Sequence, residues 1–365
     1  MPAPAVVTDV VTRPLPHTAG AAAVPAPAAA TAAGWRTLTA SPVPTGRPVS
    51  AAPAAPQHQG ARAAAWVDDY VRKIAQHIHV RIEDNLLIRI PNTAYRLNPT
   101  AAKMLRFLLD GGTVADILAR YPGREDAVAQ DIHHFACDLR ALLKGCWTEG
   151  ESRRAIELVP FTMPYSALPV LSELAVTYRC NLACRFCYAG CGTAPRRDEL
   201  STRNLCRVID RIRRDADVPS VSFTGGEPTL HPDLPALVRH ASTLGMWTNL
   251  ITNGTQLTPR LVAALRAAGL DSVQISIEGA DEATHDAIVG QAGAFAAAMA
   301  GLDRVRAAGL RVHTNTTICA LNRDAVPAIV AMTQALGLER LSMNMLMPCG
   351  SARGSLAELL ITYRD

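Results

Sequence analysis

The sequence predicts an α/β protein whose larger part is a barrel of repeated strand–helix units, preceded by a small α+β region. Six strand-like segments alternate with helical stretches, at about residues 171–178, 220–224, 247–252, 272–277, 311–318 and 341–345. Repeated βα units imply a parallel sheet with right-handed crossovers. Glycine and polar residues follow several of these strands, which indicates an active site at the carboxyl ends of the strands.

Apolar residues in two of the helical stretches recur at the spacing of a buried helix face, i, i+3, i+4 and i+7. They are Leu205, Val208, Ile209 and Ile212 in one stretch and, at nearly this spacing, Phe295, Met299, Leu302 and Val305 in the other. The strands instead alternate, because successive side chains point to opposite faces. Val273, Ile275 and Ile277 share an apolar face, whereas Gln274, Ser276 and Glu278 share a polar face, as do His313, Asn315 and Thr317. We expect the polar faces to line the barrel interior.

Three cysteines, Cys180, Cys184 and Cys187, follow the first barrel strand at CxxxCxxC spacing. Cysteine thiolates usually hold iron–sulfur clusters, and a cubane with three protein ligands keeps one iron open. Zinc sites usually show two CxxC pairs or Cys/His mixtures, and no second pair follows here. Disulfides fit poorly, because the nine cysteines are an odd number and we find no secretory signal. Cys191 is interpreted as a bystander, since the three-cysteine pattern is complete without it.

The cysteine spacing resembles that of the radical S-adenosylmethionine (SAM) superfamily, and three later segments support the resemblance. Gly225-Gly226-Glu227-Pro228 resembles the GGEP motif of the family, Thr252-Asn-Gly254 its TNG segment, and Ser276-Ile-Glu-Gly279 its S-[LIM]-[DE]-G segment. The resemblance implies a [4Fe–4S] cluster held by the three cysteines and capped by SAM, which the cluster cleaves reductively to a 5′-deoxyadenosyl radical.

The resemblance also implies which residues contact SAM. Gly225, Gly226 and Glu227 would hold the amino group of its methionine, since a carboxylate accepts hydrogen bonds from an ammonium group. Thr252 and Ser276 would contact its carboxylate or ribose, with Asn315 as a further candidate. Phe186 would lie near the adenine, where an aromatic ring can stack. Core packing explains Phe186 equally well, and Thr and Ser are common strand formers. The sequence identifies no catalytic acid or base.

The resemblance narrows the barrel to a partial (β/α)6 TIM-like radical SAM barrel, and we assign residues 170–365 to this core domain. Relatives with this architecture commonly continue into a cysteine-rich SPASM segment. After Cys191 only Cys206, Cys319 and Cys349 remain, and they are dispersed. We therefore expect this chain to lack a SPASM segment.

Two regions precede the barrel. Residues 1–62 are crowded with Ala and Pro, so we expect a disordered tail that cannot bury enough apolar surface to fold. Residues 66–148 look like a small domain, with strands at 77–82, 85–90 and 94–97 and three helices. Asn98 and Pro99 begin the first helix, and Gly111-Gly-Thr113 ends it and caps the second. The third helix carries an apolar stripe of Val128, Ile132, Phe135, Leu139 and Leu142.

This order of elements, with the segments from Tyr95 and from Asp110, resembles the small peptide chaperones of the pyrroloquinoline quinone pathway. That winged-helix-like fold is also the leader-peptide recognition element of peptide-modifying enzymes. A short sheet with an exposed edge can accept a peptide as an added strand. The alternative is a DNA-binding winged helix, whose recognition helix should be basic. Here the third helix carries Glu125, Asp126, Asp131 and Asp138 against Arg124, Arg140 and Lys144, and the chain's net charge is only +4.

The sequence therefore predicts a radical SAM enzyme of the peptide-maturase type, in which a linker at 149–169 joins the two parts. Residues about 77–143 would bind the leader of a ribosomally made precursor peptide, and the barrel would crosslink or epimerise it. A reductase or flavodoxin would donate the electron. Two alternatives stay open: a radical SAM enzyme acting on a small molecule, of the molybdopterin-precursor or haem-modifying type, and a non-catalytic peptide-binding protein with a vestigial barrel.

The sequence also bears on location. It shows no signal peptide and no uncharged apolar stretch long enough to span a bilayer. We expect a cytoplasmic protein without membrane or nucleic-acid partners, since reduced thiols and an oxygen-sensitive cluster suit that compartment.

Overall fold

The structure is a computed structural model that describes residues 64–146, 155–157, 166–192 and 199–362. The Ala- and Pro-rich stretch predicted to be disordered lies outside these residues. No helix of the described residues is long and apolar enough to cross a membrane.

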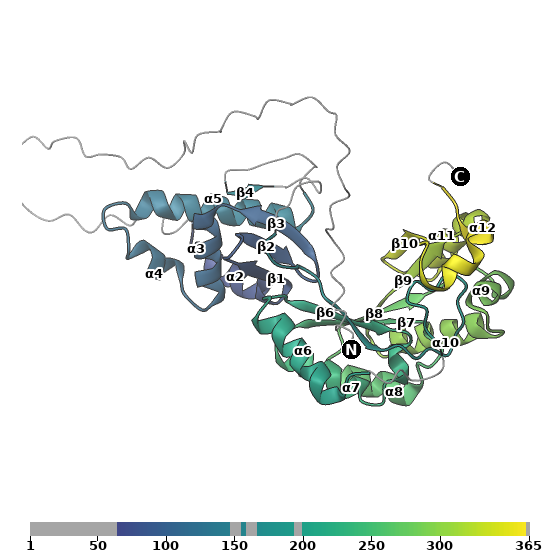
Figure 1. Cartoon of the computed structure of the whole chain (residues 1–365). Helices are drawn as coiled ribbons and strands as arrows, with labels where there is room; N and C mark the ends of the chain where they lie inside the picture. Colours follow the sequence, from purple (N-terminus) through teal and green to yellow (C-terminus); the bar gives the residue numbers. More distant parts are fainter. Residues whose placement is uncertain (1–63, 147–154, 158–165, 193–198, 363–365) are drawn as a thin grey trace, which may run out of the picture. The chain divides into compact units, whose positions relative to one another are not determined.

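Six parallel strands form the larger sheet, and each strand pairs with the next strand in the chain (Figure 1). They are β5 (Glu173–Thr177), β6 (Ser220–Gly225), β7 (Trp247–Thr252), β8 (Ser272–Ser276), β9 (Arg311–Ile318) and β10 (Leu341–Met345). β5 and β10 are the two ends of this order, so the sheet is a partial barrel. All six predicted strands are present, and the predicted fold class is confirmed.

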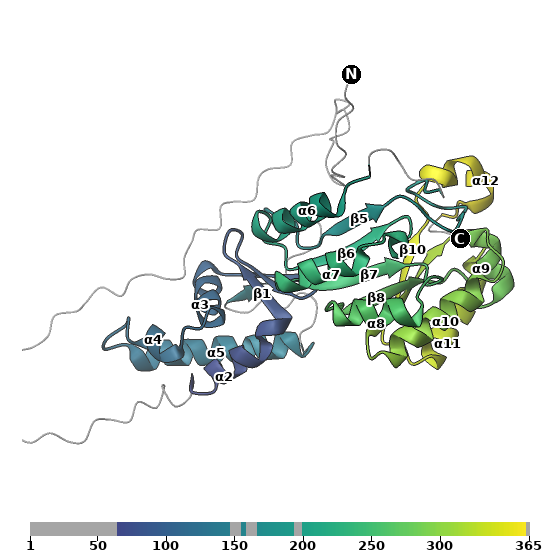
Figure 2. The same ribbon diagram turned by 90° about the horizontal axis from the view of Figure 1, so that it is seen from below.

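Helices follow the strands and cover one face of the sheet, as Figures 1 and 2 show for α6, α7 and α8. They are α6 (Thr202–Arg214), η2 (Pro228–Leu230), α7 (Leu234–Thr243), α8 (Pro259–Ala267), α9 (Glu282–Val289), α10 (Ala294–Ala307), η3 (Arg323–Ala325), α11 (Val326–Ala335), η4 (Gly350–Ser355) and α12 (Leu356–Leu359). Several begin where a side-chain oxygen caps a free backbone N–H. Ser201, Thr258 and Asp281 each accept from the N–H three residues later.

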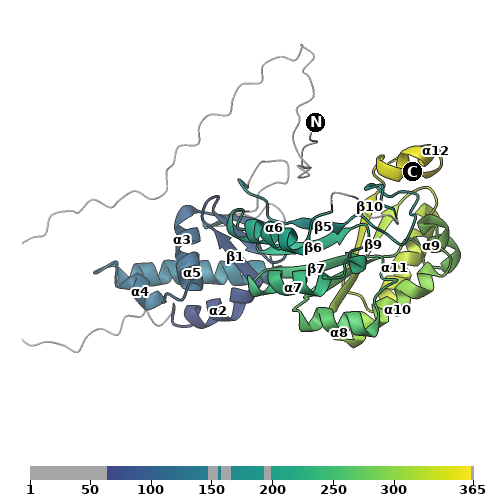
Figure 3. The same ribbon diagram turned by 60° about the horizontal axis from the view of Figure 1, so that its bottom comes forward.

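The core lies between the sheet and these helices. Val221, Phe223, Leu250, Val273 and Ile275 are at most 1 % exposed and pack in one cluster with apolar side chains of the covering helices. Burying each such side chain contributes about 1.5–3 kcal/mol. The opposite face of these strands carries the polar residues, as the alternation predicted. α9 and α12 lie at the carboxyl end of the sheet (Figures 2 and 3).

A second hydrophobic core belongs to the region before the barrel. Its elements are α2 (Val67–Ile74), η1 (Ala75–His77), β1 (Ile78–Arg81), β2 (Leu86–Arg89), β3 (Thr93–Leu97), α3 (Pro99–Leu109), α4 (Val114–Leu118) and α5 (Glu125–Leu143). Asn98 caps α3 by accepting from Ala101 N at 2.8 Å, and Thr113 forms a capping box with Asp116 on α4. The predicted strands and caps of this region are therefore present. We call residues 64–146 the front module.

Three elements of this part of the chain were not predicted: α2, the three-residue η1 and β4. α2 is short, and only Val67 and Val71 of its residues are buried, so its periodic signal is weak. β4 (Ile156–Glu157) has two residues and pairs antiparallel with β3 at Arg96 and Leu97. Too few residues make up β4 for an alternating pattern to be recognised.

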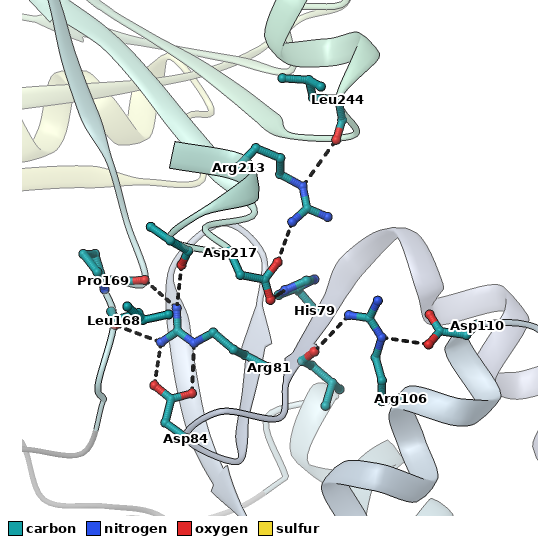
Figure 4. Close-up of polar contacts among 12 residues, drawn as sticks. His79, Arg81, Asp84, Arg106, Asp110, Leu168, Pro169, Arg213, Asp217 and Leu244 are labelled. Carbon is teal, nitrogen blue, oxygen red and sulfur yellow. Dashed lines mark hydrogen bonds and ion pairs between the residues drawn. The ribbon is translucent and has the colours of Figure 1, made fainter. Parts of the chain in front are cut away.

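Arg81 of β1 links the front module to the barrel (Figure 4). Its side chain is 0 % exposed and forms a two-bond ion pair with Asp84, at 2.9 and 2.8 Å. The same guanidinium donates to the carbonyl oxygens of Leu168, at 2.8 Å, and Pro169, at 2.7 Å, just before β5. A guanidinium has five donors, and this arrangement satisfies a charge that would otherwise be costly to bury.

A second set of contacts joins the same two parts (Figure 4). His79 Nε2 lies 2.8 Å from the Asp217 carboxylate, which Arg213 Nη1 also contacts at 2.6 Å. Ser220 Oγ donates to the carbonyl of Pro91 at 2.8 Å. Asp217 and Ser220 lie at the amino end of β6, so the front module contacts the barrel at that end of the strand.

Candidate functional site

A cavity of about 330 Å³ lies at the carboxyl ends of the barrel strands. This volume falls within the usual range of small-molecule sites. All of the predicted site residues except Glu227 line it, namely Cys180, Cys184, Phe186, Cys187, Gly225, Gly226, Thr252, Ser276 and Asn315. Residues from four strands and from the cysteine segment therefore meet in one place, as the barrel prediction required.

The cysteine segment, residues 179–192, is held by backbone hydrogen bonds on three sides. Cys180 N donates to Gly192 O at 2.8 Å, which closes the segment on itself. The N–H groups of Ala183 and Arg185 donate to carbonyls at the carboxyl end of α9, at 3.0 and 3.1 Å. Ser351 N in η4 donates to Cys187 O at 2.8 Å. Elements distant in sequence thus fix where the three thiols lie.

Gly225 and Gly226 allow the end of β6 to press against the start of the cysteine segment. Gly226 N donates to Thr177 O at 2.8 Å, and a Cβ on Gly226 would lie 2.2 Å from Arg179 O. Gly225 has φ +140°, and a Cβ there would lie 2.1 Å from Thr177 O. These glycines therefore support the cysteine segment as well as lining the cavity.

Replacing Gly226 by alanine should displace the cysteine segment. We expect Gly226→Ala to lower the free energy of unfolding by about 1–3 kcal/mol, the usual cost of overpacking, and to lower the iron bound per chain after reconstitution. Gly192→Ala is the matched control, because a Cβ on Gly192 meets no atom within 4 Å. Iron analysis and urea denaturation measure both effects. Equal iron content and stability in the two variants would contradict this role of Gly226.

The three thiols lie in different surroundings. A hydrogen bond from the Cys191 thiol, with backbone N–H groups of residues 189–191, lowers the pKa of Cys187 to about 5, although burial opposes this. Burial raises the pKa of Cys180 and, more strongly, that of Cys184, which the nearby Glu278 carboxyl raises further. A metal would have to replace the proton of the two buried thiols, since metals bind thiolates. Cys191 lines the cavity, although we interpreted it as a bystander.

The residues present fit a cubane cluster better than a single metal ion. Within the described part of the chain, no three His, Cys, Asp or Glu side chains gather closely enough to hold one ion. The ligands of a cubane cluster instead each bind a different iron and stay apart, as three cysteines around one cavity can. A cluster bound there would lie beside polar groups of β7, β8 and β9 that could hold SAM.

Glu227 is not among the residues that line the cavity, and it is 1 % exposed. Its carboxylate accepts from Thr252 Oγ1 at 2.6 Å, from Asn253 N at 2.8 Å and from Thr229 Oγ1 at 2.5 Å. These bonds tie the GGEP segment to the TNG segment. The hydroxyl hydrogen of Thr252 is therefore directed to Glu227, and it is Thr252 that lines the cavity.

Asn315 and Ser276 both line the cavity, and their contacts with SAM stay predictions. Asn315 Oδ1 accepts from Asn344 Nδ2 on β10 at 2.9 Å, which fixes the amide at the cavity wall. Phe186 lines the cavity and also packs against a small apolar cluster, made up of Ile288, Cys319, Leu346, Ala352 and Leu359. This side chain thus belongs both to a small core and to the cavity wall, and its proximity to adenine stays a prediction.

Among the cavity residues that the sequence did not single out as site residues are two buried titratable ones, Glu278 and His285. Glu278 is 2 % exposed, burial raises its pKa to about 8, and Thr317 N donates to it at 2.7 Å. His285 of α9 is 1 % exposed, and burial lowers its pKa. The alternation of the strand from 272 placed Glu278 on the polar face, which was an available signal. Nothing in the sequence separated His285 from other helix residues.

Known proteins resemble this chain over the barrel region. The family model of the radical SAM superfamily matches residues 174–330, which include all ten predicted site residues. The chain is 35% identical over 179 residues to an AdoMet-dependent heme synthase of Nitratidesulfovibrio vulgaris, covering 49% of this chain and 48% of that protein. It is 37% identical over 176 residues to a PqqA peptide cyclase of Xanthomonas campestris, covering 48% and 46%. The chain thus spans about half the length of the curated relatives it matches.

Among solved structures, Streptococcus suis SuiB bound to the precursor peptide SuiA superimposes with a TM-score of 0.55 at 16% identity, covering 79% of this chain and 65% of that chain. SuiB bound to S-adenosylmethionine gives a TM-score of 0.54 over the same shares. At such identity the likeness shows the fold alone, and that fold extends beyond the barrel. The cysteine segment, the parallel barrel and the matching family model together identify residues 174–330 as a radical SAM domain.

Proposed function

We propose that this chain is a radical SAM enzyme that modifies a ribosomally made precursor peptide. One observation carries the proposal: a cavity ringed by Cys180, Cys184 and Cys187 occurs in the same chain as a front module with its own core and a sheet edge that can accept a strand. The bound cluster and SAM would supply a 5′-deoxyadenosyl radical that abstracts a hydrogen atom from the peptide. A reductase or flavodoxin would supply the electron.

The chain's own residues would position the reactants. Cys180, Cys184 and Cys187 would bind three irons, and the cavity walls of β7, β8 and β9 would hold SAM through Ser276 and Asn315. The buried carboxylate of Glu227 would act by holding the TNG segment in place. Its Oε2, which accepts from Asn253 N, keeps a lone pair that could accept from the SAM amino group, as predicted.

The outer edge of β3 is where we propose that the leader binds. Leu97 N donates inward to Asn85 O at 2.8 Å, whereas Asn98 N donates outward to Ala155 O at 3.0 Å. Because N–H groups alternate along an antiparallel strand, the N–H of Ala94 points outward, like that of Asn98. Within the described residues, β4 covers this edge only at Arg96 and Leu97. Residues Thr93–Tyr95 could therefore pair with an added strand.

The two proposed sites are separated along the barrel. The front module contacts the barrel beside Pro169 and at Ser220, whereas Thr224 and Gly225 line the cavity at the other end of β6. At about 3.3 Å per residue, strand β6 alone spans roughly 17 Å. A leader held by the front module must therefore be joined to the modified residue by at least about five extended residues. The tether raises the effective concentration of the core peptide at the cavity.

Removing one outward N–H of β3 should weaken leader binding alone. Proline is tolerated on an edge strand when its missing N–H faces outward, so Ala94→Pro should fold. We expect the leader Kd to rise about tenfold, equivalent to about 1.4 kcal/mol, close to the value of one hydrogen bond. Ala94→Val is the matched control because it keeps the N–H. Candidate precursor peptides are taken from small open reading frames near the gene, and their binding is measured by fluorescence anisotropy.

Deoxyadenosine formed from SAM without peptide is measured in the same variants. It should be equal in Ala94→Pro, Ala94→Val and the unaltered chain, since Ala94 belongs to the front module. If Ala94→Pro binds the peptide as tightly as Ala94→Val does, the β3 edge is not the leader site. If it loses deoxyadenosine formation instead, the two-part model is wrong.

A small-molecule radical SAM enzyme is the second candidate, and one finding favours it. The heme synthase relative matches the barrel about as well as the peptide cyclase does, at 35% against 37% identity. The front module favours the peptide, because haem modification gives no role to a sheet edge for an added strand. A mass change in a candidate precursor peptide encoded near the gene, after turnover, would show that the substrate is a peptide. Turnover of a porphyrin substrate with no change in the peptide would decide for the small molecule.

A further inference from the structure

His285 presents a hydrogen-bond donor in the cavity for which the described residues offer no acceptor. Glu278 N donates to His285 Nδ1 at 3.0 Å, so Nδ1 carries the lone pair. In a neutral imidazole the proton then lies on Nε2. Nε2 is fully buried and has no hydrogen-bond partner among the described residues. A buried N–H without an acceptor is costly, so this group calls for an acceptor that is not part of the chain.

The rest of the surroundings fix the His285 ring. The ring lies 5.7 Å from that of Phe295, tilted by 57°. Gly279 gives the room for this arrangement, since a Cβ there would lie 2.8 Å from His285 N. With Nδ1 held by Glu278 N and the ring packed on Phe295, the direction of Nε2–H is set before any ligand binds.

α9 directs His285 toward the cysteine segment. His285 and Val289 are four residues apart, so they share one face of the helix, and both line the cavity. Val289 packs in a small cluster with Leu182, against which Cys180 and Cys184 lie. The carbonyl of Val289 also accepts from Ala183 N at 3.0 Å. His285 therefore lies one helical turn, about 5.4 Å, from a residue that contacts the thiols.

The three thiols differ in the donors around them. Cys187 has the backbone N–H groups of residues 189–191, and Cys180 Sγ accepts from Leu182 N at 3.5 Å. For Cys184, burial is the main influence on the thiol, and its own backbone N–H is a donor beside it. Sulfur ligands of a cluster are usually hydrogen-bonded, which tunes the cluster's potential. Fewer hydrogen-bond donors are thus identified beside the Cys184 thiol than beside the Cys187 thiol, and His285 Nε2–H could supply one.

We propose that His285 Nε2–H donates a hydrogen bond to the sulfur atoms of the iron–sulfur cluster on the side held by Cys184, and so raises the reduction potential of the cluster. This inference rests on the proposed cluster. His285 is a positioning and tuning residue in this account. Reduction adds negative charge to the cluster, and a donor to its sulfurs stabilises the reduced form. Losing the donor should therefore make the potential more negative.

The test compares His285→Phe with His285→Gln in the reconstituted full chain without SAM. Phenylalanine keeps the ring but has no donor. Glutamine carries an acceptor and a donor on one carbon, as the imidazole carries Nδ1 and Nε2, so it can accept from Glu278 N and keep the donor. Redox titration followed by EPR gives the midpoint potential. We expect a more negative potential for His285→Phe, a value near that of the unaltered chain for His285→Gln, and the same iron content in all three.

A spectroscopic measurement on the unaltered chain keeps the inference testable if a variant fails to fold. His285 is the single histidine among the described residues that line the cavity. Histidine labelled with ¹⁵N should then give a weak nitrogen coupling to the reduced cluster in pulsed EPR. Absence of that coupling would overturn the proposal. Equal shifts of the midpoint potential in both variants would also overturn it, because they would indicate lost packing. An unchanged potential with weaker SAM binding in His285→Phe would overturn it as well, because that result would assign the donor to SAM. An unaltered chain that binds no iron would instead refute the cluster itself.

Discussion

Replacing Cys184 by alanine should abolish both the cluster and SAM cleavage. Cys184 lines the cavity between Cys180 and Cys187 and supplies one of only three predicted iron ligands. A cubane with two cysteine ligands has two open irons and is expected to be lost during reconstitution. We expect the brown absorbance to disappear, the iron content to fall toward zero and deoxyadenosine to fall below detection.

Cys206→Ala is the control for this change. Cys206 is partly buried on α6 and packs against the main core, so its loss should cost little and leave the iron content unchanged. Circular dichroism of both variants checks that the barrel still folds. Retention of SAM cleavage in Cys184→Ala would refute the assignment of this cysteine as an iron ligand.

Replacing Arg81 by methionine should produce the largest loss of stability among single changes outside the cavity. Arg81 is 0 % exposed, and the side chain of its partner Asp84 is 7 % exposed. Removing one member of a buried ion pair leaves the other charge without a partner, which typically costs about 3–5 kcal/mol. The carbonyls of Leu168 and Pro169 also lose their donor. Urea denaturation measures the change in the free energy of unfolding.

An exposed ion pair gives the comparison. Lys73 and Asp69 lie 2.6 Å apart on α2 with side chains 72% and 57% exposed. Lys73→Met should change the free energy of unfolding by less than about 1 kcal/mol, because exposed pairs contribute little. If Arg81→Met is as mild as Lys73→Met, the contact between the front module and the barrel does not depend on this buried arginine.

The strands of the barrel could be predicted because each repeats the same physical pattern. Val273 and Ile275 alternate with Gln274 and Ser276, and one face must be buried while the other lines a cavity. A helix cap depends on residues that are close in sequence, which is why the start of α3 at Asn98 could be predicted. Features that depend on neighbours close in sequence or on a repeated pattern are recorded in the sequence itself.

Features created by tertiary contacts were not predictable in the same way. Arg81 reads as an ordinary strand-end arginine, and only folding buries it against carbonyls at Leu168 and Pro169. His285 reads as one polar residue in a helix, and its buried Nε2 becomes meaningful only when α9 packs beside the cysteine segment. Glu227 was assigned to SAM by motif, whereas the fold directs its carboxylate to Thr252 and Asn253.

These observations connect the cavity to the rest of the chain. Gly226 and α9 hold the cysteine segment on two sides, and Ser351 of η4 holds it on a third. The positions of the three thiols therefore depend on elements from the whole barrel. The front module contacts the barrel at the amino end of β6, and it would hold the proposed peptide there.

The most direct test is anaerobic reconstitution of the unaltered chain with iron and sulfide, reduction with dithionite, and chromatography for 5′-deoxyadenosine formed from SAM. The account predicts deoxyadenosine at about four irons per chain, as one cubane cluster requires. A chain loaded with iron that forms no deoxyadenosine would contradict the proposed catalytic function, and the peptide-binding alternative would then explain the front module better.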